Sequence, residues 1–125
     1  MEKNYLQLNN IDGYVRAYRL SNYVWNIVIG WEYLSKRTIG EQFIRAVDSI
    51  SANLAEGFGR YNKKDKIKFY HYSMGYQKES LDWNDKSFAR NLLTKAQYNH
   101  IHSELNALPI EINQLIKFTF ERLKK

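Results

Sequence analysis

The chain of 125 residues contains no cysteine and a single proline, and it has six glycines. The lack of cysteine excludes a disulfide framework, a thiolate zinc site and a cysteine nucleophile. Scarce proline and glycine favour long helices over many short strands. No apolar run reaches the roughly 18 residues of a membrane span, and the first ten residues lack the regions of a signal peptide. We therefore expect a cytoplasmic protein without membrane association.

The charge balance favours an anionic partner. The 44% apolar and 26% charged residues are typical of a folded domain, and the length predicts one domain over residues 1–125. Nineteen basic and 13 acidic side chains give a formal net charge of +6. A positive charge of this size suits nucleic acid but does not identify it.

The hydrophobic periodicity predicts four helices, at about residues 12–35, 39–56, 63–90 and 95–123, after an N-terminal arm over residues 1–11. Thr38 with Glu41, and Thr94 with Gln97, have the spacing of capping boxes, and Asn62 is a third N-cap. The connections are short, so consecutive helices should be antiparallel. The expected fold is an all-α, up-down four-helix bundle.

Three residues are expected to end or bend these helices. Gly57 can take the left-handed conformation that ends the second helix, and Asn91 can end the third. Pro109 removes one backbone hydrogen bond from the fourth helix, so we expect a kink near Asn106 or, alternatively, a break into two helices.

The helix over residues 63–90 carries two apolar stripes. One consists of Ile67, Tyr70, Met74, Gln77, Leu81 and Phe88. The other, about 150° away around the helix, consists of Phe69, Tyr72, Tyr76 and Trp83. One stripe suffices to pack the helix into its own bundle, and a wet aromatic stripe is unusual on a monomer. The second stripe is therefore either a subunit interface or a surface that tolerates solvent and is partly covered by the N-terminal arm.

Two polar features suggest binding. Arg45, Ser49, Asn53 and Glu56 share one face of the helix over residues 39–56, which is either solvated or part of a network with a neighbouring helix. Arg60, Lys63, Lys64, Lys66 and Lys68 form a basic cluster at the start of the next helix. Such cations bind phosphates without reading sequence, and Tyr61 and Tyr70 are candidate stacking faces. The alternative is a solvated helix start with ordinary lysines. Cations at a helix N-terminus oppose the helix dipole, which mildly favours a functional reason.

The stretch RAVDSISANLAEGFGR, residues 45–60, resembles the signature of a bacterial four-helix-bundle family. The family was first noticed as reading frames inside intervening sequences of large-subunit ribosomal RNA genes. Asn62, Lys64-Asp65 and Phe69 occupy the next places of the pattern, and Gly75 and Glu79 match a later part. Tyr76 departs from it, because the family usually has Ser there.

The resemblance implies a ring-shaped homopentamer, similar to the accessory variability determinant protein of diversity-generating retroelements, which binds nucleic acid and a reverse transcriptase. It supports oligomerisation through the third helix, and the aromatic stripe of Phe69, Tyr72, Tyr76 and Trp83 is the interface that we expect there. It also implies a structural polar motif, which consists of Arg45, Ser49, Asn53, Glu56, Gly57 and Glu79.

Catalytic and metal motifs are missing from the pattern. A di-metal bundle site needs Glu-x-x-His pairs, but Lys68, Gln97 and Asn99 stand three residues before the three histidines. The Gly57–Arg60 turn lacks the spacing of a phosphate-binding loop. We therefore expect no catalytic residue, metal or cofactor.

These observations leave two hypotheses. The first is a non-catalytic homo-oligomer that binds RNA, a ribonucleoprotein or DNA electrostatically through its basic surface. The second is a scaffold whose partner is another protein and whose lysines provide only solubility. Charge reversal within the basic cluster separates them.

Overall fold

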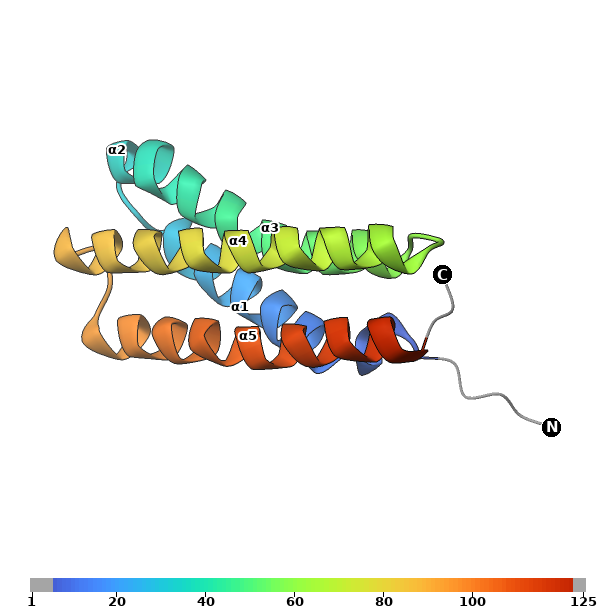
Figure 1. Cartoon of the computed structure of the whole chain (residues 1–125). Helices are drawn as coiled ribbons and strands as arrows, with labels where there is room; N and C mark the ends of the chain where they lie inside the picture. Colours follow the sequence, from blue (N-terminus) through green and yellow to red (C-terminus); the bar gives the residue numbers. More distant parts are fainter. Residues whose placement is uncertain (1–5, 123–125) are drawn as a thin grey trace.

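A computed structural model, which describes residues 6–122, is an all-α four-helix bundle (Figure 1). The long helices are α1 (Asp12–Val28), α3 (Glu41–Phe58), α4 (Lys63–Ala89) and α5 (Lys95–Arg122). A 3-10 turn (Leu8–Asn10) precedes α1, and a short α2 (Tyr33–Ser35) follows α1. The expected last residue of the fourth helix, Leu123, and residues 1–5 of the expected arm lie outside the described residues.

Each long helix packs against the one that follows it, and α5 closes the bundle against α1. The core is apolar where α1, α3 and α5 face one another. Its buried residues are Leu20, Val24, Val28, Phe43, Val47, Ile50, Leu54, Ile101, Leu105, Leu108 and Ile112. Phe43, Val47, Ile50 and Leu54 form the buried face of α3. Burial of large side chains like these stabilises a fold by about 1.5–3 kcal/mol each.

Arg16 fastens α1 to α5 with two ion pairs. Its Nε lies 2.8 Å from Glu111 Oε1 and its Nη1 lies 2.9 Å from Glu104 Oε1. The bond to Glu111 raises the pKa of the already basic Arg16 guanidinium. Charge-assisted bonds of this kind fix geometry as well as adding energy.

The caps of α4 and α5 agree with the prediction. The Asn62 side chain accepts a hydrogen bond from the Asp65 amide at 2.9 Å. In the reciprocal box at α5, the Thr94 amide donates to Gln97 Oε1 at 2.9 Å and the Gln97 amide donates to Thr94 Oγ1 at 3.1 Å. Asn91, with φ of 62°, takes the left-handed conformation just after α4.

The expected boundary between the first two helices is wrong. The helix α1 ends at Val28 rather than near residue 35, and Thr38 caps nothing. Its hydroxyl donates to the Leu34 carbonyl at 2.7 Å inside a continuous helix, in which α2 leads through a π-helical turn (Lys36–Gly40) into α3. Gly40 serves close packing here, because an added Cβ would lie 2.7 Å from Val28 Cγ1.

We expected Gly57 to end its helix in a left-handed conformation, and this expectation is wrong. The helix α3 continues to Phe58, and no glycine within residues 6–122 has positive φ. Gly57 lies instead at a close approach between α3 and α4. A Cβ at this position would lie 2.8 Å from Tyr70 Cε1 and 2.9 Å from the Lys66 carbonyl oxygen. Glycine is therefore required by contact, not by a turn.

The helix α4 turns a polar seam to the core. Its buried residues repeat at spacings of three and four: Tyr70, Ser73, Gln77, Ser80, Asn84 and Ser87. Serine is small enough for close helix packing, and the Ser73 hydroxyl donates to the Ile50 carbonyl of α3 at 2.7 Å. The expected core stripe is therefore wrong in part, because Met74 and Leu81 are half-buried and Phe88 is exposed.

The second stripe lies on one flank of this seam, about 80° from its centre at 100° per residue. The first stripe, apart from Tyr70 and Gln77, which belong to the seam, lies on the other flank. Met74 and Leu81 on one flank, and Tyr76 and Trp83 on the other, are half-buried against the core. The aromatic stripe is thus largely used inside the chain.

Pro109 lies inside α5 without breaking it into two helices. Proline has no N–H to offer the carbonyl four residues earlier, which belongs to Leu105. Gln77 of α4 supplies the missing donor, since its Nε2 donates to the Leu105 carbonyl oxygen at 2.9 Å. The kink expected near Asn106 stays a prediction.

Candidate nucleic-acid interface

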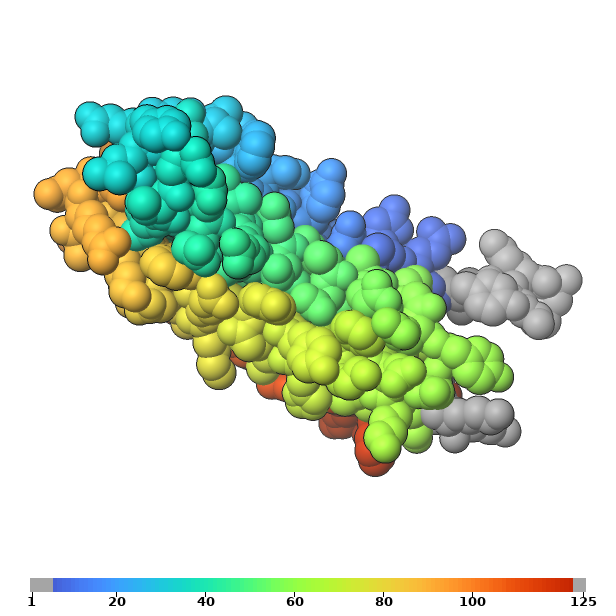
Figure 2. Space-filling view, turned by 90° about the horizontal axis from the view of Figure 1, so that it is seen from above, coloured from blue at the N-terminus to red at the C-terminus, as the bar shows by residue number. Residues whose placement is uncertain are grey.

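The predicted basic cluster lies at one end of the bundle, where the α3–α4 turn meets the last turns of α5 (Figure 1). We call residues 56–69 and 117–122 together the basic end. Figure 2 shows side chains of the α3–α4 turn and the start of α4, in green, protruding at this end. Contact between the two segments is direct, because Lys63 Nζ donates to the Phe120 carbonyl at 3.1 Å.

Two of the five predicted lysine and arginine side chains hold helix ends together. Lys63 reaches the last turn of α5, and Lys66 Nζ donates to the Phe58 carbonyl at the end of α3 at 2.6 Å. Partial burial lowers the pKa of Lys66. Both ammonium groups therefore lie at helix C-termini, where the dipole favours cations. The predicted conflict with the α4 dipole is offset, and it is no argument for function.

Arg60 and Lys68 both lie over the ring of Phe69, with the charged groups 4.5 Å and 5.3 Å from its centroid. Arg60 also pairs with Glu56 at 2.9 Å, and Lys68 lies 3.8 Å from Asp65. Phe69, which we expected at a subunit interface, is half-buried beneath these cations. In the structure, the Phe69 ring packs under two cations of the basic end.

The fold adds cations and rings that the sequence pattern did not connect to the cluster. Lys117 and Arg122 of α5 are exposed, and so is Lys64 of α4. Phe118 and Phe120 accompany Lys117 and Arg122, although they lie more than 50 residues after Lys64 in the chain. No local signal links the two segments, because the link is the packing of α5 against α4. Tyr70, a predicted stacking face, is buried in the core.

The charge is unevenly distributed between the two ends of the bundle. The basic end has seven cationic and three acidic side chains. The corresponding opposite end, residues 29–41 and 82–95, has five cationic and four acidic ones. The positive potential is therefore concentrated at one end, and phosphate attraction scales with such local excess.

The predicted polar motif does not form a network between helices within residues 6–122. The Ser49 hydroxyl donates to the Arg45 carbonyl and the Asn53 amide to the Ser49 carbonyl, both inside α3. Arg45 and Glu56 are exposed, and Glu56 bonds to Arg60 one turn later. Asn53 is half-buried. The solvated-face interpretation describes this side of α3 as it stands in one chain.

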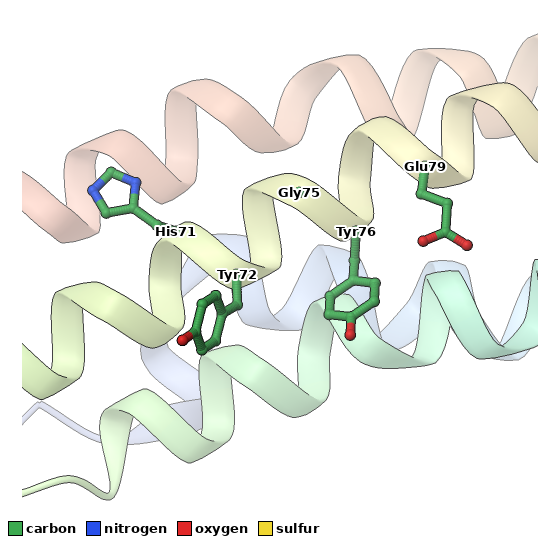
Figure 3. A pocket seen from close by; sticks show the side chains of 5 residues that line it. All are labelled: His71, Tyr72, Gly75, Tyr76 and Glu79. Atoms are coloured by element: carbon green, nitrogen blue, oxygen red, sulfur yellow. The ribbon is translucent and has the colours of Figure 1, made fainter.

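A shallow groove runs along the outer side of α4, lined by His71, Tyr72, Gly75, Tyr76 and Glu79 (Figure 3). Tyr72, Tyr76 and Glu79 point toward α3 while His71 points the other way. Gly75 forms the floor, and among residues 6–122 an added Cβ there would meet no atom within 4 Å beyond the adjoining backbone of α4. Glu79 also accepts a hydrogen bond from Trp83 Nε1 at 2.9 Å.

Glycine in an exposed helix costs about 1 kcal/mol relative to alanine. Contacts within the chain explain Gly57 and Gly40 but not Gly75. Of the four predicted interface residues, Tyr72 is exposed at this groove, whereas Phe69, Tyr76 and Trp83 are half-buried.

Among residues 6–122, no group of three or more His, Asp or Glu side chains is placed to hold a metal ion. Two histidines contact other side chains. The ring centroids of His100 and Tyr23 are 4.5 Å apart, and the His102 Nδ1 lies 3.1 Å from the Asn106 amide nitrogen. In the same part of the chain, no helix has the length and apolar content needed to cross a bilayer.

Comparison with known proteins gives a family. The family model described as "23S rRNA-intervening sequence protein" matches residues 9–114. A search of curated proteins finds no match. A solved structure from Bacteroides thetaiotaomicron, described as a protein of unknown function from the S23 ribosomal protein family, superposes with a TM-score of 0.75 at 17% identity, covering 89% of this chain and 99% of that one. At this identity the superposition supports the fold. Because the family model spans most of the chain, the protein belongs to the 23S rRNA-intervening sequence protein family.

Proposed function

We propose that this protein is a non-catalytic, self-associating bundle that binds RNA electrostatically through its basic end. The observation that carries the proposal is the charge difference between the two ends, seven cations against three acids at one and five against four at the other. The family description, which names 23S rRNA, and the neighbour's assignment to a ribosomal protein family support an RNA partner over DNA.

The cations have different tasks in this proposal. Lys63 and Lys66 hold the ends of α5 and α3, so they shape the surface. Lys64, Lys68 and Lys117 are exposed and carry the attraction to phosphates. Phosphate contacts of this kind release counterions and make affinity fall steeply with salt.

The test is a fluorescence-anisotropy titration of labelled RNA at two salt concentrations, comparing wild type with Lys64→Glu/Lys68→Glu. These positions avoid the lysines that hold helix ends. We expect at least a tenfold loss of affinity and a salt slope reduced by roughly 1.4, about 0.7 per lost phosphate contact on a single strand.

Lys78→Glu/Lys95→Glu is the matched control, because both lysines are exposed, lie outside the basic end and give the same change in net charge. It should lose much less affinity. An equal loss in both variants would mean that net charge, not this surface, drives binding. No binding at low salt would reject the proposal.

The α4 groove favours a second role, contact with another protein chain. We assign it to a second copy of this chain, since the family resemblance implies a ring of five and Gly75 leaves room for close helix approach. The alternative is a scaffold that binds a different protein and no nucleic acid. In that case, charge reversal at the basic end would leave the partner complex intact.

A further inference from the structure

Resting on the proposed function, we infer that the basic end recognises single-stranded nucleic acid by stacking unpaired bases on Tyr61 and Phe120. Double-stranded RNA is then a poor ligand. The inference comes from the aromatic side chains of this end and not from its charge.

Both rings are largely exposed to solvent. Tyr61 has 84% of its surface accessible and Phe120 has 65%, and Phe118 is exposed beside it. They belong to two segments, the α3–α4 turn and the last turn of α5, that Lys63 joins through its bond to the Phe120 carbonyl. Single exposed apolar residues are ordinary, but large rings gathered on one basic end form a surface for a flat ligand.

Cationic side chains lie over aromatic rings on this surface. Five of the seven cation–ring pairs formed by residues 6–122 are here, including Lys63 Nζ at 4.8 Å from the Phe120 centroid and Arg122 Cζ at 5.7 Å from the Phe118 centroid. A nucleotide presents the same pair of features, a flat base beside a phosphate. Stacking on aromatic rings with cations along the backbone is the general mode of single-strand binding.

A duplex uses this surface poorly. Its bases are stacked on each other, and the deep major groove of A-form RNA excludes side chains. Only phosphates would meet the basic end, so Tyr61 and Phe120 would contribute nothing and would separate the cations from the backbone. A surface built for phosphates alone has no need of exposed rings.

The experiment compares three fluorescein-labelled ligands at one salt concentration: a 20-nucleotide uridine-rich single strand, a blunt RNA duplex of the same length, and a single strand of equal phosphate number whose central positions are abasic. We expect wild type to bind the intact single strand about tenfold or more tightly than either other ligand. The abasic strand isolates the bases from the charge.

The variant Tyr61→Leu/Phe120→Leu keeps apolar bulk but removes stacking. It should lose about tenfold or more on the intact strand, with no change on the abasic strand or in the salt slope. Tyr33→Leu, an exposed tyrosine in α2, is the matched control and should bind as wild type does. Circular dichroism melting confirms that each variant folds.

The outcomes separate this inference from the proposal beneath it. Equal binding of duplex and single strand, or an unchanged affinity of Tyr61→Leu/Phe120→Leu, rejects base stacking while leaving the loss in Lys64→Glu/Lys68→Glu as evidence for electrostatic RNA binding. If no nucleic acid binds at low salt, both statements are wrong.

Discussion

Gly57 and Gly59, two residues apart, differ in how much room there is for a side chain. A methyl group at Gly57 would lie within 3.0 Å of Tyr70, Lys66 and Phe69, whereas at Gly59 it would make ordinary contacts of 3.6 Å and 3.7 Å. Overpacking of this kind costs about 1–3 kcal/mol. The short distance between α3 and α4 therefore depends on Gly57.

We expect Gly57→Ala to lower the free energy of unfolding by about 1–3 kcal/mol in urea denaturation, despite the better helix propensity of alanine. Gly59→Ala is the matched control and should be nearly neutral. Equal effects of the two substitutions would show that helix propensity, and not contact, decides at this end of α3.

Tyr70 gives the fold a specific pH dependence. Burial raises the pKa of its hydroxyl to about 12, from an ordinary value of about 10. The folded state therefore holds its proton more tightly than the unfolded chain does. This contribution is complete below pH 10 and is lost as the pH rises from 10 toward 12.

Between pH 8 and pH 11, the unfolding free energy of wild type should fall by about 1.4 kcal/mol more than that of Tyr70→Phe. One pKa unit corresponds to about 1.4 kcal/mol. Urea denaturation at both pH values measures the difference. Tyr18→Phe, at an exposed position, should follow wild type. If Tyr70→Phe also follows wild type, the burial of Tyr70 does not control the alkaline transition.

The Gln77–Pro109 pairing couples two helices through one carbonyl. Pro109 deprives the Leu105 carbonyl of its usual donor, and Gln77 Nε2 takes that place from α4. In Pro109→Ala, the restored amide would satisfy Leu105 from within α5. The value of the Gln77 hydrogen bond should therefore depend on residue 109.

A double-mutant cycle tests this coupling. We expect Gln77→Leu to cost about 1–3 kcal/mol in the wild-type background, because a buried carbonyl loses its donor, and distinctly less in the Pro109→Ala background. Unfolding free energies of the four proteins give the coupling directly. Equal costs in both backgrounds would mean that Gln77 is not the substitute donor.

The sequence predicts an element correctly when the residues that define it are close together in the chain. Asn62, Thr94 and Gln97 cap their own helices, so spacing in the sequence is enough to find them. Thr38 has the same spacing as Thr94, but the helix around it continues because Gly40 lets it pack closely on Val28. That contact joins separate helices, and no local pattern contains it.

The seam of α4 was missed for a related reason. Hydrophobic periodicity treats Ser73, Ser80 and Asn84 as surface residues, yet they face the core because small or hydrogen-bonding side chains allow close helix packing. The α5 part of the basic end was also out of reach, since Lys117 and Phe120 join Lys63 only through the fold. The local cluster from Arg60 to Lys68 was found, but the structural tasks of Lys63 and Lys66 were not.

The proposed self-association requires a small residue at Gly75 of α4. If a second copy packs on the groove, a large side chain at Gly75 should prevent it while leaving the single chain folded. Within residues 6–122, an added Cβ at Gly75 meets no atom within 4 Å beyond the adjoining backbone of α4. Light scattering should therefore show a smaller assembly for Gly75→Leu and for Tyr72→Glu.

Gln114→Leu introduces the same side chain at an exposed position of α5 and is the control, with the assembly of wild type expected. A monomeric wild type, or an unchanged assembly in Gly75→Leu, would contradict the interface that we propose. In the second case, another surface of the bundle holds the copies together.

The central claim is that RNA binds at the basic end. Hydrogen–deuterium exchange of the full chain, with and without a saturating uridine-rich RNA at low salt, tests it most directly. We predict slower exchange within residues 56–69 and 117–122 and unchanged exchange within residues 29–41 and 82–95. Protection at the opposite end, along the α4 groove instead, or nowhere, would contradict the account.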